Sequence, residues 1–330
     1  MSKSVLSEDA KADIKNVGIS IFKAWLEENK IELKSKKNFF DALELGLDEG
    51  KITKEQITHA LCELEENSDK KIRFFKIKND FKKLLGLKNQ FLKTLRLDHG
   101  WQSVKNYSVK VKAKDASTFN YMSWEGNTLK IKYSEKHYNV EADFEANQFE
   151  KNPKIVYIVI LINFEDGLVQ IRYDNPGALH KHKNAKGKPS EAAYEKYYED
   201  LLMNLFDDLN YGDLNFVGLT NKILNDDTIP YRIHKGVNTL ADGGKQMYSL
   251  PFNMDIRENR EFQAAAEYAE DWLTDELSGY WKWEDSDEAL NKDLFMRISR
   301  KASEIRVQRG CLEKELNYGI AKIKEILEGL

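Results

Sequence analysis

The chain of 330 residues is 41% hydrophobic and 11% aromatic, which excludes a disordered polypeptide and is enough to build more than one core. Its longest apolar run, residues 155–162, is too short to cross a membrane, and the N-terminus lacks the apolar segment of a signal peptide. Two cysteines far apart in sequence indicate a reducing compartment, so we expect a cytoplasmic protein, and the frequent Lys, Asn, Glu and Ile suggest a bacterial source.

The net charge of −4 conceals two blocks of opposite charge. Residues 70–136 hold 17 Lys and Arg against 5 Asp and Glu, whereas residues 190–295 hold 9 against 23. This segregation predicts that the basic block binds a polyanion, or that it docks onto the acidic block of the same chain or of a second copy.

The first hundred residues predict a helical module. Apolar residues at helical spacing predict helices over 7–29 and 36–47, and a third helix follows Thr53, which stands at capping-box spacing from Gln56. The turn before Thr53 has the glycine of a calcium loop, but its ligand positions lack carboxylates. We therefore expect a helix-turn-helix-like module over 1–100, followed by an α+β domain over 101–330.

Lysines then alternate with apolar residues. Residues 70–80 predict a short strand and 80–97 a basic amphipathic helix, after which 107–114 and 128–136 show the period of two that is typical of strands. A strand with one lysine face is either solvated on that face or pressed against an anion.

The clearest hairpin lies at 153–176. Its first arm is apolar on both faces and is expected at the centre of a sheet, and Asp166 with Gly167 supplies the tight turn. Residues 138–149 predict a further strand.

The C-terminal half mixes helices and strands. We predict helices over 190–209, 213–226, 255–277 and 311–327, a hairpin over 229–250, and two short strands between 293 and 310. The expected fold is α+β, with an N-terminal helical module, a central mainly antiparallel sheet and a helix-rich C-terminal region with additional short strands.

The loop 178–188 combines two histidines with four lysines. His180 and His182 are spaced to share one face of a strand and to bind zinc, but no third ligand is near and the lysines repel a cation. Lysines ahead of a helix that begins near Ser190 instead suit a phosphate group. A solvated loop has the same composition, so both interpretations stay open.

The basic block has the composition of a nucleic-acid surface, because cations contact phosphates and its interleaved aromatic rings stack on bases. The alternative is that the rings form a core while the lysines keep the chain soluble. The predicted nucleic-acid-binding residues are Lys82, Lys83, Lys110, Lys112, Lys130, Lys132, Lys181, Lys183, Lys186 and Lys188.

Catalytic patterns are incomplete. Asp143, Glu145 and Asp174 are candidate acids of a metal-dependent nuclease, but Gln170 and Arg172 stand where such a site needs Glu and Lys. The acids of 141–145 are equally explained as the solvent-exposed face of an edge strand. The sequence contains no Walker or dinucleotide motif, and we expect no cofactor.

Aromatic residues also occur in the acidic half, at 278–288. Tyr280, Trp281 and Trp283 stand beside acids and predict a protein-binding patch, since Trp and Tyr dominate interface hot spots. A core strand that buries one of the tryptophans is the alternative.

Three functions remain. The first is a non-catalytic DNA- or RNA-binding subunit of a bacterial multi-protein system, such as phage or mobile-element defence, whose acidic region 190–295 engages a protein. The second is a metal-dependent nuclease with a degenerate site. The third is a scaffold that self-assembles by docking basic regions onto acidic ones.

Overall fold

A computed structural model describes most of the chain, in two compact units. Unit 1 comprises Met1–Asp69 and Asn215–Leu330, and unit 2 comprises Lys70–Leu214. The predicted domain boundary near residue 100 lies outside the described residues. These are 6–67, 69–78, 118–143, 148–174, 196–200, 211–240, 242–268, 272–286, 289–301, 303–307 and 310–330, with the side chains of 118, 139–143, 148–154 and 268 also outside the description.

The N-terminal part of unit 1 is a module of short helices. The single helix predicted over 7–29 is two helices, because Gly18 adopts φ 102°, which interrupts the helical backbone. The predicted capping box is confirmed: the amide of Gln56 donates to Thr53 Oγ1 at 3.2 Å, and that of Thr53 donates to Gln56 Oε1 at 2.8 Å. The helices are α1 (Glu8–Val17), α2 (Ile19–Glu28), α3 (Phe39–Asp48) and α4 (Lys54–Asn67).

The C-terminal helix closes this module. Leu312 packs into the apolar core of α1 to α4, and the Cys311 thiol lies 3.3 Å from the Asn67 carbonyl oxygen at the end of α4. The two ends of the chain therefore share one core in unit 1.

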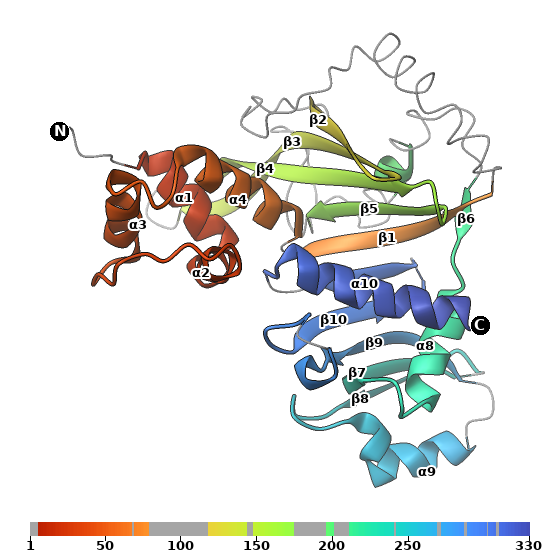
Figure 1. Ribbon diagram of the computed structural model, residues 1–330. Coiled ribbons are helices and arrows are strands. Elements are labelled where there is room, and N and C mark those ends of the chain that lie inside the picture. Colours follow the sequence, from red (N-terminus) through yellow and green to blue (C-terminus); the bar gives the residue numbers. More distant parts are fainter. Residues whose placement is uncertain are drawn as a thin grey trace. The chain divides into compact units, whose positions relative to one another are not determined.

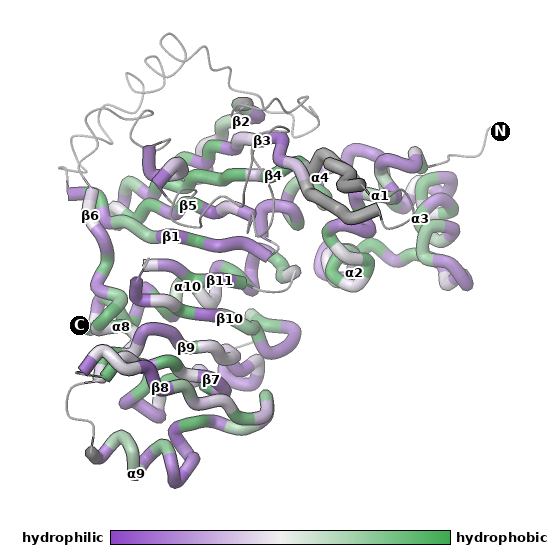
Figure 2. The backbone as a smooth tube through the Cα atoms, turned by 180° about the vertical axis from the view of Figure 1, so that it is seen from behind, coloured by the Kyte–Doolittle hydropathy of each residue, from purple (hydrophilic) through white to green (hydrophobic). Residues whose placement is uncertain are grey.

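Unit 2 is built on an antiparallel sheet in the order β2-β3-β4-β5-β1-β6. The predicted hairpin is confirmed, with β4 and β5 joined at Asp166 and Gly167, where Gly167 has φ 65°. Figure 2 shows the hydrophobic run of β4 that forms the centre of this sheet. The strands are β1 (Lys70–Ile77), β2 (Thr118–Glu125), β3 (Thr128–Asp143), β4 (Gln148–Asn163), β5 (Leu168–Asp174) and β6 (Tyr211–Asp213).

Unit 1 contains a second antiparallel set of strands, in the order β8-β7-β9-β10-β11. Two helices, α8 and α10, lie across one face of it (Figure 1). Trp281 and Met296 point into the core beneath them, where Trp281 contacts Tyr318 and Met296 lies against Gly319. The elements are α8 (Phe216–Asn225), β7 (Tyr231–Thr239), β8 (Lys245–Ser249), β9 (Leu273–Trp281), β10 (Leu294–Ser299), β11 (Glu304–Val307) and α10 (Glu313–Glu328).

The helix predicted over 255–277 is wrong in its second half. Residues Ile256–Glu258 form a 3₁₀ turn, η1, and α9 covers only Arg260–Tyr268, whereas β9 takes the centre of the sheet between β7 and β10. A Cβ at Gly279 would collide with the carbonyl oxygen of Arg232 on β7, so the glycine permits this close approach. Strand pairing on both sides outweighs the local helical pattern.

The predicted α+β class is confirmed, with helices at both ends of the chain and antiparallel strands between them. Among the described helices, none is both long and apolar enough to cross a membrane.

Candidate nucleic-acid interface

Most of the predicted phosphate and metal contacts fall on parts of the chain outside the described residues. The same holds for the candidate acid Glu145, while Asp143 is described only in its backbone. Outside the description lie Lys82, Lys83, Lys110, Lys112, His180, Lys181, His182, Lys183, Lys186 and Lys188.

The two described lysines of the predicted set, Lys130 and Lys132, face inward. They share one face of β3 and are 6% and 2% exposed. Lys130 forms an ion pair with Glu125 at 3.4 Å, and the Lys132 ammonium lies 4.7 Å from the centre of the Tyr157 ring. Of the two alternatives for this strand, a solvated lysine face is therefore wrong.

Further cations lie on the same face of the unit 2 sheet. Lys70 on β1 pairs with Asp174 on β5, and Arg172 donates two hydrogen bonds to Gln170 Oε1, at 3.2 and 3.0 Å. The antiparallel register places Arg172 and Lys132 on either side of Val159 in one row across β5, β4 and β3. These charges are thus held by groups of the chain itself.

The candidate nuclease acids are far apart along the sheet. Asp174 lies beside Tyr157, whose amide donates to Asp174 Oδ2 at 2.9 Å, and Tyr157 pairs with Ser134 on β3. Asp143 follows Ser134 by nine positions on the same strand, on the order of 30 Å. Among the described residues, no group of three His, Cys, Asp or Glu side chains is placed to hold a metal.

The predicted aromatic patch divides into an inner and an outer part. Trp281 is fully buried and packs on Tyr231, with ring centres 4.9 Å apart. This agrees with the alternative prediction of a core strand that buries one of the tryptophans. Trp283, in the 3₁₀ turn η2 (Trp283–Asp285), is 51% exposed. Tyr280 projects from β9 on the side opposite to Trp281, away from α8 and α10.

We call that side of the β7 to β11 sheet, opposite α8 and α10, the outer face. Its first row crosses three strands: Arg232 on β7 pairs with Tyr280 on β9, which pairs with Phe295 on β10. The two rings lie 5.0 Å apart in an edge-to-face arrangement, and the Arg232 guanidinium lies 5.4 Å from the centre of the Tyr280 ring. All three side chains are partly exposed.

The second row of the outer face is basic. In register it runs from Lys235 on β7 through Ser278 to Arg297 on β10 and Arg306 on β11. The three arginines of the two rows form ion pairs with acids nearby. Arg232 pairs with Asp293 at 2.6 Å, Arg297 with Glu276, and Arg306 with Asp69 at 3.5 Å. Three arginines and one lysine thus adjoin two aromatic rings on one surface.

His234 also lies on this surface, at a β-bulge. Ile233 pairs with Gly279 and Lys235 with Ser278, so His234 is the extra residue of β7. Its ring contacts Tyr280 and Phe295, with centres 5.8 and 5.6 Å away, and that of Phe252 at 4.8 Å. Burial, together with the charges of Lys235 and Arg232, lowers the pKa of His234.

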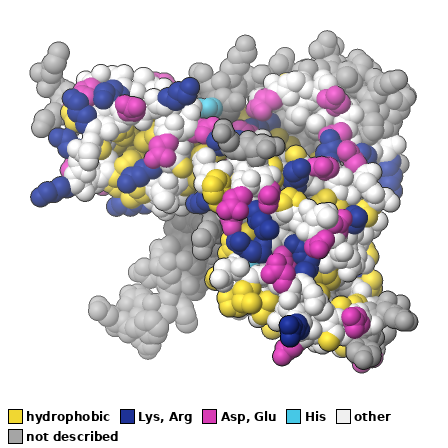
Figure 3. Space-filling view, turned by 60° about the horizontal axis from the view of Figure 1, so that its bottom comes forward, with side chains coloured by type: hydrophobic (Ala, Val, Ile, Leu, Met, Phe, Trp, Pro, Cys, Tyr) yellow, Lys and Arg dark blue, Asp and Glu magenta, His cyan; other side chains and the backbone are white. Residues whose placement is uncertain are grey.

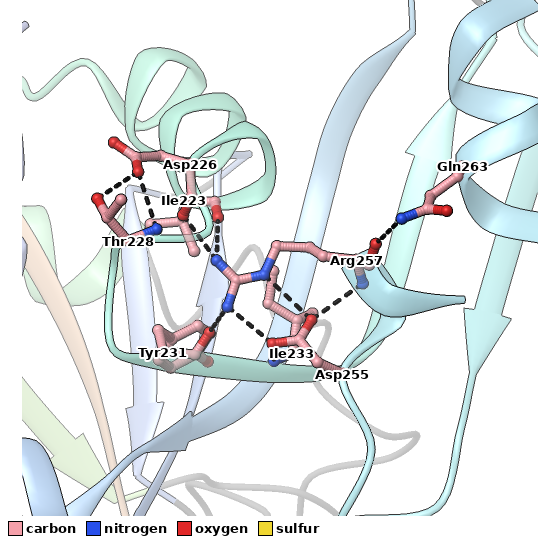
Figure 4. Close-up of polar contacts among 8 residues, drawn as sticks. All are labelled: Ile223, Asp226, Thr228, Tyr231, Ile233, Asp255, Arg257 and Gln263. Carbon is pink, nitrogen blue, oxygen red and sulfur yellow. Dashed lines mark hydrogen bonds and ion pairs between the residues drawn. The ribbon is translucent and has the colours of Figure 1, made fainter. Parts of the chain in front are cut away.

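The turn that carries Phe252 is fixed at its end by a buried ion pair (Figure 4). Arg257 bonds bidentately to Asp255, at 3.1 and 2.7 Å, and its guanidinium also donates to the carbonyl oxygens of Asp226 and Tyr231, each at 2.7 Å. Asp255 in turn accepts the amide of Ile233 at 3.3 Å. This network connects the turn to Tyr231 and Ile233, the part of β7 that precedes its pairing with β8.

Charges of both signs are mixed on the described part of one face. In the view of Figure 3, Lys and Arg side chains are interspersed there with Asp and Glu. On that face the described cations do not form a broad basic field.

Sequence reasoning identified Tyr280 but missed Phe295, Arg297, Arg232 and His234. The signal for β10 was present, since Phe295 and Arg297 alternate with apolar Leu294, Met296 and Ile298. The relation between the strands was hidden because β9 was predicted as helix. No sequence signal marks the bulge that places His234 and Lys235 on the same face.

The sequence matches no protein-family model, and no curated protein matches it.

Proposed function

We propose that this protein binds single-stranded nucleic acid on the outer face of unit 1, as a non-catalytic subunit. The observation that supports this is the row of Arg232, Tyr280 and Phe295, with two partly exposed rings directly opposite each other on adjacent strands. Rings on an antiparallel sheet form a stacking platform for unpaired bases, and arginines beside them contact phosphates or stack in their own right.

Stacking has to supply most of the affinity. Unit 1 holds 36 Asp and Glu against 26 Lys and Arg, so its overall field does not attract a polyanion. Each base stacked on an aromatic side chain contributes about 1 to 3 kcal/mol. A duplex keeps its bases inside the helix, so we expect single strands to bind in preference to duplex.

The lysine loop 180–188 supplies a second contact in this proposal. Its four lysines precede a helix, and unit 2 as a whole holds 25 Lys and Arg against 19 Asp and Glu. Lysines of this kind contact phosphates of a nucleic acid.

The test is fluorescence anisotropy with labelled single-stranded DNA and RNA and matched duplexes, at about 50 mM salt. We expect single strands to bind more tightly than duplexes. Tyr280→Ala and Phe295→Ala should each weaken binding about tenfold. Val217→Ala, which removes an exposed apolar side chain from α8 on the opposite face of the sheet, is the matched control and should bind as the wild type does. Equal binding by all four proteins would overturn the proposal.

A protein partner is the second candidate for the same surface. Trp283, Met254 and Phe252 are exposed in unit 1, and aromatic residues, Met and Arg are enriched at protein interfaces. This candidate would be favoured if no nucleic acid binds, while Trp283→Ala reduces co-purification of a protein from the native host.

The proposed setting is the cytoplasm of a bacterial cell, in a multi-protein system such as defence against phage. Two cysteines far apart in sequence, Cys62 and Cys311, and the Lys- and Asn-rich composition support this part of the proposal.

A further inference from the structure

The feature that carries a further inference is the environment of His234. Its side chain is 8% exposed, and its buried Nε2 atom forms no hydrogen bond with the described part of the chain. A buried polar atom without a partner destabilises the fold, typically by about 1 to 3 kcal/mol. Each such atom calls for an explanation, and a missing ligand is one.

The residues around His234 indicate what kind of ligand fits. Three rings surround the imidazole, those of Phe252, Tyr280 and Phe295, with centres 4.8 to 5.8 Å from its own. Aromatic walls with one polar atom suit a planar heterocycle that stacks on a ring and accepts or donates one hydrogen bond at its edge.

Phe252 is the part of this cluster that can yield. Its side chain is 64% exposed, so turning its ring away from His234 gives up little buried area. The backbone on either side is held independently, because the amide of Leu250 donates to the His234 carbonyl oxygen at 2.8 Å and Asp255 is fixed by Arg257. Rotation of one side chain would uncover the imidazole edge beside Tyr280.

We propose that one base of the bound strand takes the place of the Phe252 ring, stacks beside Tyr280 and forms a hydrogen bond with His234 Nε2. This inference rests on the proposed function and adds base preference to it. Stacking alone tolerates every base, whereas a hydrogen bond to a base edge distinguishes bases by their donors and acceptors. The bulge at His234 keeps Lys235 on the same face of β7, next to the imidazole.

The test compares binding of oligo(dA), oligo(dC) and oligo(dT) of about ten nucleotides to the full chain. We expect the wild type to favour one of them about three- to tenfold, which corresponds to a single hydrogen bond. His234→Phe keeps a ring and removes the nitrogen, so the three affinities should become equal within twofold. His234→Gln, which restores a polar atom near the position of Nε2, should recover part of the preference.

An unchanged preference in His234→Phe overturns the inference and leaves the proposed function standing. Failure of all three oligonucleotides to bind the wild type overturns both. The imidazole ¹⁵N resonances of the wild type give a second measurement that needs no variant. Addition of the preferred oligonucleotide should shift the Nε2 resonance of His234, and a resonance that does not move at saturation also overturns the inference.

Discussion

At the scale of single residues, His234 shows how a β-bulge changes the chemistry of a strand. With regular alternation in place of the bulge, Lys235 would lie on the other side of β7, and the imidazole would not share a face with it. The bulge places a titratable ring among three aromatic rings and two cations. Its pKa is lowered by burial and by those cations, from an ordinary value of 6.5.

The lowered pKa of His234 predicts a pH dependence of stability. The unfolded chain takes up the proton first, so stability falls as the pH drops below about 6.5 and stops falling once the pH passes the folded-state pKa. Urea denaturation at pH 7.5 and at pH 5 should show a smaller difference in His234→Phe than in the wild type. His59→Gln, on the half-exposed surface of α4, is the control for losing a histidine. An equal pH effect in wild type and His234→Phe would contradict this prediction.

At the scale of elements, the Arg257–Asp255 pair connects α8, β7 and η1. The guanidinium donates to carbonyl oxygens at the end of α8 and on β7. It therefore fixes the turn that carries Phe252 without using any residue of the outer face.

Arg257→Ala should destabilise unit 1 by about 3 to 5 kcal/mol, because it leaves the Asp255 carboxylate buried without its cation. Chemical denaturation measures this change. Arg260→Ala removes the same charge from an exposed position three residues later and should cost little. The prediction fails if the two variants unfold at the same denaturant concentration.

The strands show what pattern alone can specify about an element. Alternation in 128–136 correctly placed Lys130 and Lys132 on one face of β3, because the period of a strand is two. It did not predict that this face is buried, since burial depends on chain segments distant in sequence. Likewise, apolar residues keep helical spacing over 255–277, but the helix α9 ends at Tyr268. Residues 273–281 form a strand because they pair with β7 and β10.

At the scale of the whole molecule, charge differs between the two units. The excess of cations in unit 2 and of acids in unit 1 means that the salt dependence of binding reports which unit contacts the phosphates. In a plot of log K against log salt concentration, each phosphate neutralised on a single strand contributes about −0.7 to the slope. The outer face offers Arg232, Lys235, Arg297 and Arg306 for this purpose.

Binding through the outer face alone predicts a slope no steeper than about −3 in a plot of log K against log salt concentration. Replacing Lys181, Lys183, Lys186 and Lys188 together by Ala should reduce a steeper slope to this value, if the loop grips phosphates as proposed. Anisotropy titrations between about 50 and 200 mM salt measure both slopes. A slope steeper than −3 that survives the quadruple substitution would show that further cations take part.

The sequence by itself determined the local features of this protein. The capping box at Thr53, the turn at Gly167 and the α+β class each follow from interactions between residues close in the chain, which the order of residues specifies directly. The tertiary structure alone decided which strand faces are covered, that β9 lies between β7 and β10, and that His234 adjoins Tyr280 and Phe295. These relations depend on pairing between segments tens of residues apart. A periodic pattern predicts which residues share a face of a strand, but it does not predict which part of the chain packs against that face.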